Sequence, residues 1–210
     1  MIVYKEIVYI PGDAPFAMPD EQHLGRLFSD CVAFMGQVRE PKFAKRTHDG
    51  ATSALWHALW AASQVMHELA LPRNTRIVGL YTELLHDVRE DSDISKHQFD
   101  DYCRQRFDCG RWVAGYVDTM THKSFLLQAK AYYGGTAGPL TKLFTLYDKV
   151  SNLMDGTWMS VELLSEYLRF VEWLLDEVSR DYAEIAGSLW IIPFARAVVE
   201  RRRIEVELAK

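Results

Sequence analysis

The chain has 210 residues, of which 49% are hydrophobic and 25% are charged, and its formal net charge is −5. This length suits one globular domain with a substantial core, and the composition excludes a disordered chain. The acidic balance gives no support to a dedicated nucleic-acid-binding surface. No run of about 18 uncharged apolar residues occurs, so we expect no membrane-spanning helix.

Cysteine usage points to a reducing compartment. Cys31, Cys103 and Cys109 form no CxxC pair and leave an odd count. A disulfide scaffold is therefore not expected, and a cytoplasmic location is favoured. The first ten residues are apolar but carry Lys5 and Glu6, so they do not have the pattern of a signal peptide.

The N-terminal part of the chain is expected to form a short extended arm and then a helix. Residues 2–10 are rich in β-branched and aromatic residues, which predicts a strand or extended segment. Three prolines make 11–20 a loop, and Asp20 is placed to cap a helix over 21–38. The stretch 41–53 is polar and turn-like.

From residue 55 onward the hydrophobic periodicity is almost wholly helical. Asn74 and Ser95 are placed to cap two of these helices, and Pro139, after the GGTAGP break, suits the first turn of another. The expected helices cover 55–70, 75–88, 96–107, 110–120, 124–133, 139–155, 158–185 and 192–208.

These elements predict an all-α fold, a compact bundle of about eight helices with no internal repeat or linker. We divide the chain into an N-terminal arm and helix (1–40), a core (41–156) and C-terminal helices packed on the same domain (157–210). The charged tail VERRRIEVELAK is expected to be a solvated helix face, with a contact between copies in a homo-oligomer as the alternative.

A polar stripe runs along the helix expected over 139–155, whose other positions are mostly apolar. Asp148 and Asn152 are four residues apart in it, so both can address one ligand. Taken alone, such a stripe more often faces water than lines a cleft. Its members are Thr141, Thr145, Asp148, Asn152 and Asp155.

Two histidines occur in apolar helical surroundings. His86 and Asp87 follow the apolar run IVGLYTELL, where a buried carboxylate is costly unless it is paired or bound to a metal. A favourable contact with the helix dipole explains a lone His near a helix end equally well. His57, in LWHALWA, would by itself more often be a satisfied core residue than a ligand.

Together, His57, His86, Asp87 and Asp148 make a mixed nitrogen and oxygen ligand set. Such a set suits Mn²⁺, Fe²⁺, Co²⁺ or Zn²⁺ better than Ca²⁺, which prefers oxygen alone. An ion held there can activate water and polarise a phosphorus centre. The next acids along the chain, Glu90 and Asp91, are placed to orient or deprotonate that water.

LLHDVREDSDIS (84–95) and LYDKVSNL (146–153) carry a family resemblance. They resemble the HDxxED and closing Asp-Lys…Asn motifs of the HD-domain metal-dependent phosphohydrolases, and more narrowly of the hydrolase domain of the RelA/SpoT-homologue family, including its small single-domain alarmone hydrolases. Arg46, which precedes His57 by eleven residues across a loop containing Gly50, matches the family's spacing. The resemblance covers roughly residues 40 to 156.

This resemblance implies an HD-domain bundle with a bound divalent ion, Mn²⁺ first among the candidates. It implies the same four metal ligands, with Glu90 and Asp91 as the acids around the attacking water. The substrate contacts that it implies are Arg46 on a base, Asn152 and Ser151 near the ribose, and Lys45, Lys149 and Lys123 at phosphate.

The activity expected from the resemblance is 3′-pyrophosphohydrolysis of (p)ppGpp-like alarmones. An HD-type 5′-nucleotidase or a deoxynucleoside triphosphate phosphohydrolase remains open, because both share the ligand pattern and a Glu at the place of Glu90. Asp91 and Asn152 favour the alarmone type. A non-catalytic helical module that senses a nucleotide is the alternative of another class. The expected partner is a small nucleotide, with no nucleic acid and no membrane.

Overall fold

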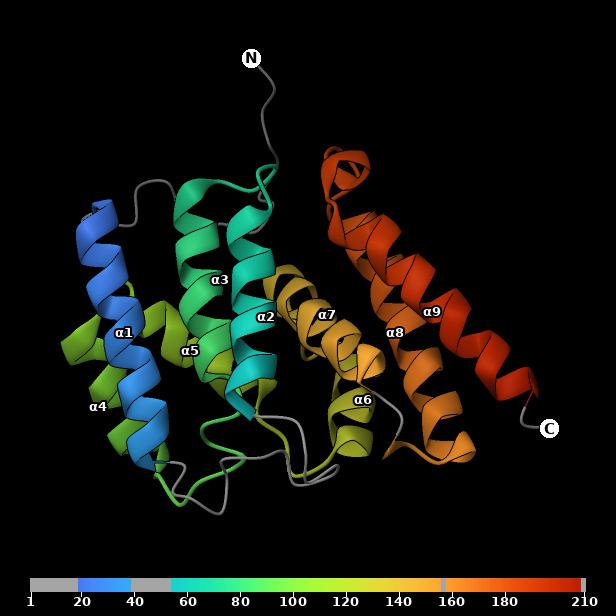
Figure 1. The fold of residues 1–210 in the computed structure, drawn as a ribbon, viewed down its shortest axis with the longest axis horizontal. Helices are drawn as coiled ribbons and strands as arrows, with labels where there is room; N and C mark the ends of the chain where they lie inside the picture. Colours follow the sequence, from blue (N-terminus) through green and yellow to red (C-terminus); the bar gives the residue numbers. More distant parts are fainter. Residues whose placement is uncertain (1–18, 39–53, 156–157, 209–210) are drawn as a thin grey trace.

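The computed structural model describes residues 19–38, 54–155 and 158–208, and these ranges are almost entirely helical, with no β-strand among them (Figure 1). The prediction of an all-α fold is confirmed. The expected arm over 2–10 and the turn over 41–53 lie outside the described residues. The elements are α1 (Glu21–Val38), α2 (Ala54–His67), α3 (Arg73–Leu85), α4 (Lys96–Arg106), α5 (Gly110–Met120), α6 (Phe125–Tyr133), α7 (Pro139–Met154), α8 (Val161–Asp181), the 3-10 helix η3 (Ala186–Ser188) and α9 (Ile191–Leu208).

Two of the predicted helix caps are confirmed and one is wrong. The Asp20 carboxylate accepts a hydrogen bond from the backbone N–H of His23 at 2.6 Å, and Ser95 forms a capping box with Gln98. Asn74 does not cap α3, because that helix begins one residue before it, after Pro72. Proline has no N–H to lose and a backbone angle suited to a helix start, which explains the earlier beginning.

Helix α7 is the centre of the molecule (Figure 1). It packs against α2, α3 and α5 on one side and against α8 and α9 on the other. Almost all of its residues are therefore buried, including four members of its polar stripe. The stripe does not face water, so its polar atoms need partners inside the protein.

Those partners fix how α7 is rotated between its neighbours. Thr145 forms a hydrogen bond of 2.8 Å with the hydroxyl of Tyr132 on α6. The Tyr147 hydroxyl donates to the buried carboxylate of Glu68 at 2.8 Å. Glu68 also accepts the backbone N–H of Trp190 at 3.2 Å, so it joins the end of α2 to α7 and to the start of α9.

A glycine allows α3 to approach its neighbours closely. A Cβ atom on Gly79 would lie 2.7 Å from a ring carbon of Phe144 on α7 and closer still to Val65 on α2. Both neighbours are fully buried and have little room to move. The lack of a side chain at Gly79 therefore brings α2, α3 and α7 into contact, and with them the residues of the candidate site.

The three cysteines are free and buried, which confirms that they form no disulfide scaffold. Burial raises the pKa of Cys31 and of Cys109 to about 12, so both are thiols at neutral pH. In the described ranges, no helix has both the length and the apolar character needed to cross a bilayer.

Candidate metal centre

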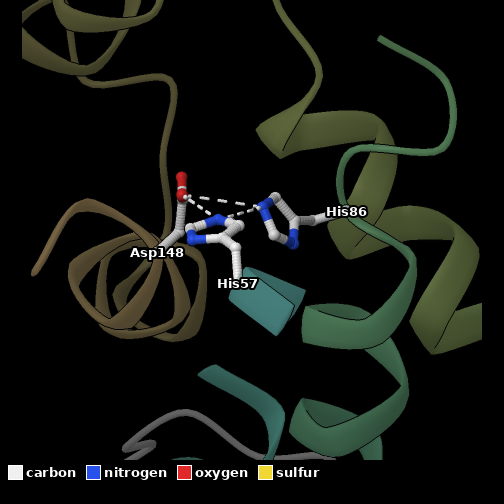
Figure 2. Close-up of side chains that lie close together, drawn as sticks. All are labelled: His57, His86 and Asp148. Atoms are coloured by element: carbon white, nitrogen blue, oxygen red, sulfur yellow. Dashed lines mark hydrogen bonds and ion pairs between the residues drawn. The ribbon is translucent and has the colours of Figure 1, made fainter. Parts of the chain in front are cut away.

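Three residues that are far apart in the sequence meet between α2, α3 and α7. His57 lies on α2, His86 directly follows α3, and Asp148 lies on α7 (Figure 2). All three side chains are buried, and together they form a group that can hold a metal ion. The two Nε2 atoms are 3.3 Å apart, and they lie 3.1 Å and 3.6 Å from Oδ1 of Asp148.

These separations fit a common coordination shell. Bonds of about 2.0–2.1 Å to a transition metal place neighbouring ligand atoms about 2.8–3.4 Å apart in octahedral or tetrahedral geometry. The three atoms of the cluster are separated by 3.1–3.6 Å before any ion is added. The donor set of two imidazoles and a carboxylate therefore suits a divalent ion without rearrangement of the helices.

His86 makes a hydrogen bond on the side of its ring away from the cluster. This bond determines which ring nitrogen presents a lone pair to the cluster. Its Nδ1 lies 2.7 Å from the backbone carbonyl of Glu83, and a carbonyl can only accept, so Nδ1 carries a hydrogen. In the neutral ring, Nε2 is then an acceptor. It faces other acceptors: a carboxylate oxygen of Asp87 at 2.9 Å and that of Asp148.

A contact of 2.9 Å between Nε2 of His86 and the Asp87 carboxylate requires a proton or a metal ion on that nitrogen. Burial alone would lower the pKa of His86, but the carboxylates of Asp87 and Asp148 raise it well above its ordinary value. Without an ion, a proton on Nε2 therefore supplies the charge. A divalent cation satisfies the same atoms and replaces that proton.

Asp148 is held by groups on its own helix. The Lys149 ammonium binds its outer oxygen, Oδ2, at 2.6 Å, and the Asn152 amide donates to Oδ1 at 2.7 Å. Burial would raise the pKa of Asp148, but Lys149 and His86 hold it well below its usual range. The carboxylate is therefore ionised, with Oδ1 directed at the imidazoles.

Asp87, the fourth expected ligand, lies at the edge of the cluster. One of its oxygens is 2.9 Å from Nε2 of His86, and the other is 3.9 Å from Nε2 of His57. Its side chain is 24% exposed, whereas the other three are almost fully buried. The cluster therefore approaches solvent on the Asp87 side, and the role of Asp87 as a ligand stays a prediction.

Glu90 lies on the same open side, one turn beyond Asp87. The residue is solvent-exposed, and one of its carboxylate oxygens accepts the backbone N–H of His122 at 2.8 Å. Desolvation of the carboxyl group by the surrounding protein, together with the charge of Asp87, raises its pKa to about 7. The backbone N–H of Asp91 bonds the Asp87 carbonyl at 2.9 Å, which continues the turn after α3.

Three residues expected to contact substrate lie against the metal-ligand candidates, and their role at a substrate stays a prediction. Lys149 and Asn152 hold Asp148, as described above, and Ser151 lies 2.8 Å from Nδ1 of His57. Of the other expected substrate contacts, Lys123 is exposed between α5 and α6, whereas Lys45 and Arg46 lie outside the described residues.

Two further residues contact the candidate site residues and were not expected from the sequence. Glu83 is fully buried, and its Oε2 lies 3.9 Å from Nδ1 of His86. Glu83 precedes His86 by three residues, and side chains with this helical spacing lie on the same face, so the contact could have been predicted from the sequence. His122 follows α5, 32 residues from Glu90, and no sequence pattern connects the two.

Comparison of the chain with protein-family models and with curated proteins gives no match. The likeness to the HD-domain phosphohydrolases therefore rests on the motifs of this sequence, and the metal centre rests on the geometry of its side chains.

Proposed function

We propose that the protein is a metal-dependent hydrolase of the HD-domain type that acts on a nucleotide phosphoester or pyrophosphate. The observation that carries the proposal is the convergence of His57, His86 and Asp148, in which Nε2 of His86 is the ring nitrogen available to an ion. A buried centre of this kind beside an acid with a pKa near neutrality is typical of hydrolytic sites.

Different residues of the protein are assigned different roles in the proposed reaction. Glu90 is half ionised near pH 7, so it can accept a proton from water and return it to a leaving group. Asp91, from the family motif, is assigned to orient the same water. A bound ion, most simply Mn²⁺, would supply Lewis acidity and stabilise developing negative charge. Lys149 adds a fixed positive charge next to Asp148.

The motifs favour a guanosine 3′-pyrophosphate alarmone as substrate, because Asp91 and Asn152 match that branch of the family. The runner-up is an HD-type 5′-nucleotidase or deoxynucleoside triphosphate phosphohydrolase. A small nucleotide is the only partner that this reaction requires. Three buried free thiols suit a reducing cytoplasm, which is the proposed location.

The first experiment is metal analysis of protein purified without chelator. About one divalent ion per chain is expected, and a protein that binds none even after addition of Mn²⁺ refutes the site.

The second experiment is a substrate panel with Mn²⁺: guanosine tetraphosphate, deoxynucleoside triphosphates, nucleoside monophosphates and NADPH. Pyrophosphate release identifies the alarmone type, whereas tripolyphosphate or orthophosphate identifies the runners-up. Nucleotide binding without product identifies a sensing module.

A double variant, Glu90→Gln with Asp91→Asn, separates the acids from the metal ligands. It should bind metal like the wild type and lose turnover by a factor of about 10² or more. The matched control is Asp93→Asn, which removes an exposed carboxylate from the same segment and should leave turnover intact. Full activity in the double variant would contradict the assigned roles.

A further inference from the structure

The two histidines of the cluster are held by different kinds of partner. His86 donates from Nδ1 to a backbone carbonyl, which no side-chain substitution can remove. Nδ1 of His57 instead meets the hydroxyl of Ser151, a buried residue 94 positions away, at 2.8 Å. Nδ1 of His57 is therefore held by a side chain of α7 rather than by the backbone.

The position of Ser151 decides which nitrogen of His57 faces the cluster. An imidazole offers Nδ1 and Nε2 on different edges, so a partner on Nδ1 directs Nε2 away from itself. Here Nε2 is directed at Asp148 and His86, 3.1 Å and 3.3 Å away. An ion on Nε2 requires the hydrogen on Nδ1, and the Ser151 oxygen can accept it.

A hydroxyl suits this place better than a carbonyl, because it can also donate. Without an ion, His57 can carry its hydrogen on Nε2 and donate it to Asp148, while Ser151 donates to Nδ1. With an ion, the hydrogen lies on Nδ1 and Ser151 accepts it. Ser151 thus gives His57 a partner in both states, with only a rotation of its own O–H.

We propose that Ser151 is a positioning residue of the metal centre, which holds the His57 ring so that Nε2 faces the ion, rather than a contact to the ribose of a substrate. The proposal rests on the proposed metal site. It predicts that Ser151 determines metal affinity in the absence of any substrate. Partners of this kind typically change metal affinity by about 10–100-fold when they are removed.

The same helix provides a matched control. Thr145 is buried, and its hydroxyl also makes one hydrogen bond of 2.8 Å, but to Tyr132 rather than to a residue of the cluster. Thr145→Val and Ser151→Ala each remove one buried hydroxyl from α7. A purely structural role for Ser151 would make the two variants alike, whereas a positioning role affects metal binding in only one.

The experiment measures Mn²⁺ and Co²⁺ dissociation constants by competition with a metallochromic chelator, on full-length protein freed of metal. The visible spectrum of bound Co²⁺ reports the ligand geometry. Ser151→Ala should weaken binding about 10-fold or more and alter the Co²⁺ spectrum. Thr145→Val should bind within about 3-fold of wild type, and Ser151→Thr, which keeps the hydroxyl, should recover most of the loss.

The outcomes are distinct. Ser151→Ala that binds metal as tightly as wild type, or equal losses in Ser151→Ala and Thr145→Val, overturns the proposal. Should Ser151→Ala not fold, as judged by circular dichroism, Ser151→Cys keeps the volume with a poor acceptor and must show the same weakening. A wild-type protein that binds neither ion refutes the proposed function itself, before Ser151 is tested.

Discussion

Replacement of Gly79 by alanine tests whether the close contact of α2, α3 and α7 builds the metal centre. The added methyl would overlap Val65 and Phe144, both fully buried. Overpacking of this kind costs about 1–3 kcal/mol, and alanine returns about 0.5–1 kcal/mol through its better helix propensity. The net loss in the free energy of unfolding is then between about 0 and 2.5 kcal/mol, and the overlap with two fully buried side chains places the expected value in the upper part of this range, at about 1–2.5 kcal/mol.

The displacement should also reach the site, because His86 directly follows α3 whereas His57 and Asp148 lie on the helices that α3 would move away from. Urea unfolding of metal-free protein measures the stability loss, and a Mn²⁺ titration measures the weakened binding. Gly115→Ala is the control: a Cβ there meets nothing within 4 Å, so that variant should gain about 0.5–1 kcal/mol. Gly79→Ala that is as stable as wild type would refute the reasoning.

Three more predictions concern the ion and the pH. Mn²⁺ at 100 times its dissociation constant should stabilise the protein by about 2.7 kcal/mol, which raises Tm by about 5–11 °C, and His86→Ala should abolish the shift in a thermal melt. If Glu90 acts as the base, kcat/KM should rise with pH through about 7, and Glu90→Gln should remove that rise in a pH–rate profile. Because the pKa of His86 is higher in the folded than in the unfolded state, protonation of His86 stabilises the metal-free protein. This stabilisation is complete below about pH 6.5, the pKa of a histidine in the unfolded state. It is lost as the pH rises through the pKa of the folded state. Urea unfolding of the wild type and of His86→Ala between about pH 6 and 9 measures this contribution. A difference in the free energy of unfolding between the two proteins that does not change with pH would contradict the prediction.

The helices could be predicted because each depends on nearby residues. Hydrophobic periodicity and local caps such as Asp20 and Ser95 act within one turn, so they are visible in the sequence. The start of α3 was predicted too late, at Asn74, because the helix begins after Pro72 without a side-chain cap hydrogen bond. The polar stripe of α7 shows the limit of this reasoning: amphipathic pattern alone favours water, yet packing from both sides buries it.

The contacts within the site could not be predicted, because they depend on how helices pack. Motifs identify His57, His86 and Asp148 as candidates, but their convergence depends on a glycine on α3 and its neighbours on two other helices. Asn152 lies one turn from Asp148, so its contact follows from helical spacing. Ser151 bonds a residue 94 positions away, and no local pattern could separate that role from a substrate contact.

The charges around the cluster bear on the proposal of an anionic substrate. The carboxylates of Asp87 and Asp148 face the cluster, and Lys149 neutralises part of that charge from the outer oxygen of Asp148. Burial raises the pKa of Glu83 well above its usual value, which favours the neutral form of this neighbouring acid. A divalent ion together with Lys149 would outweigh the two ligand carboxylates by one positive charge, before the acids Glu90 and Asp91 at the open side are counted. A phosphate group that reached a bound ion from the partly exposed Asp87 side would be attracted by the charge of that ion, whereas a neutral substrate would gain little from it.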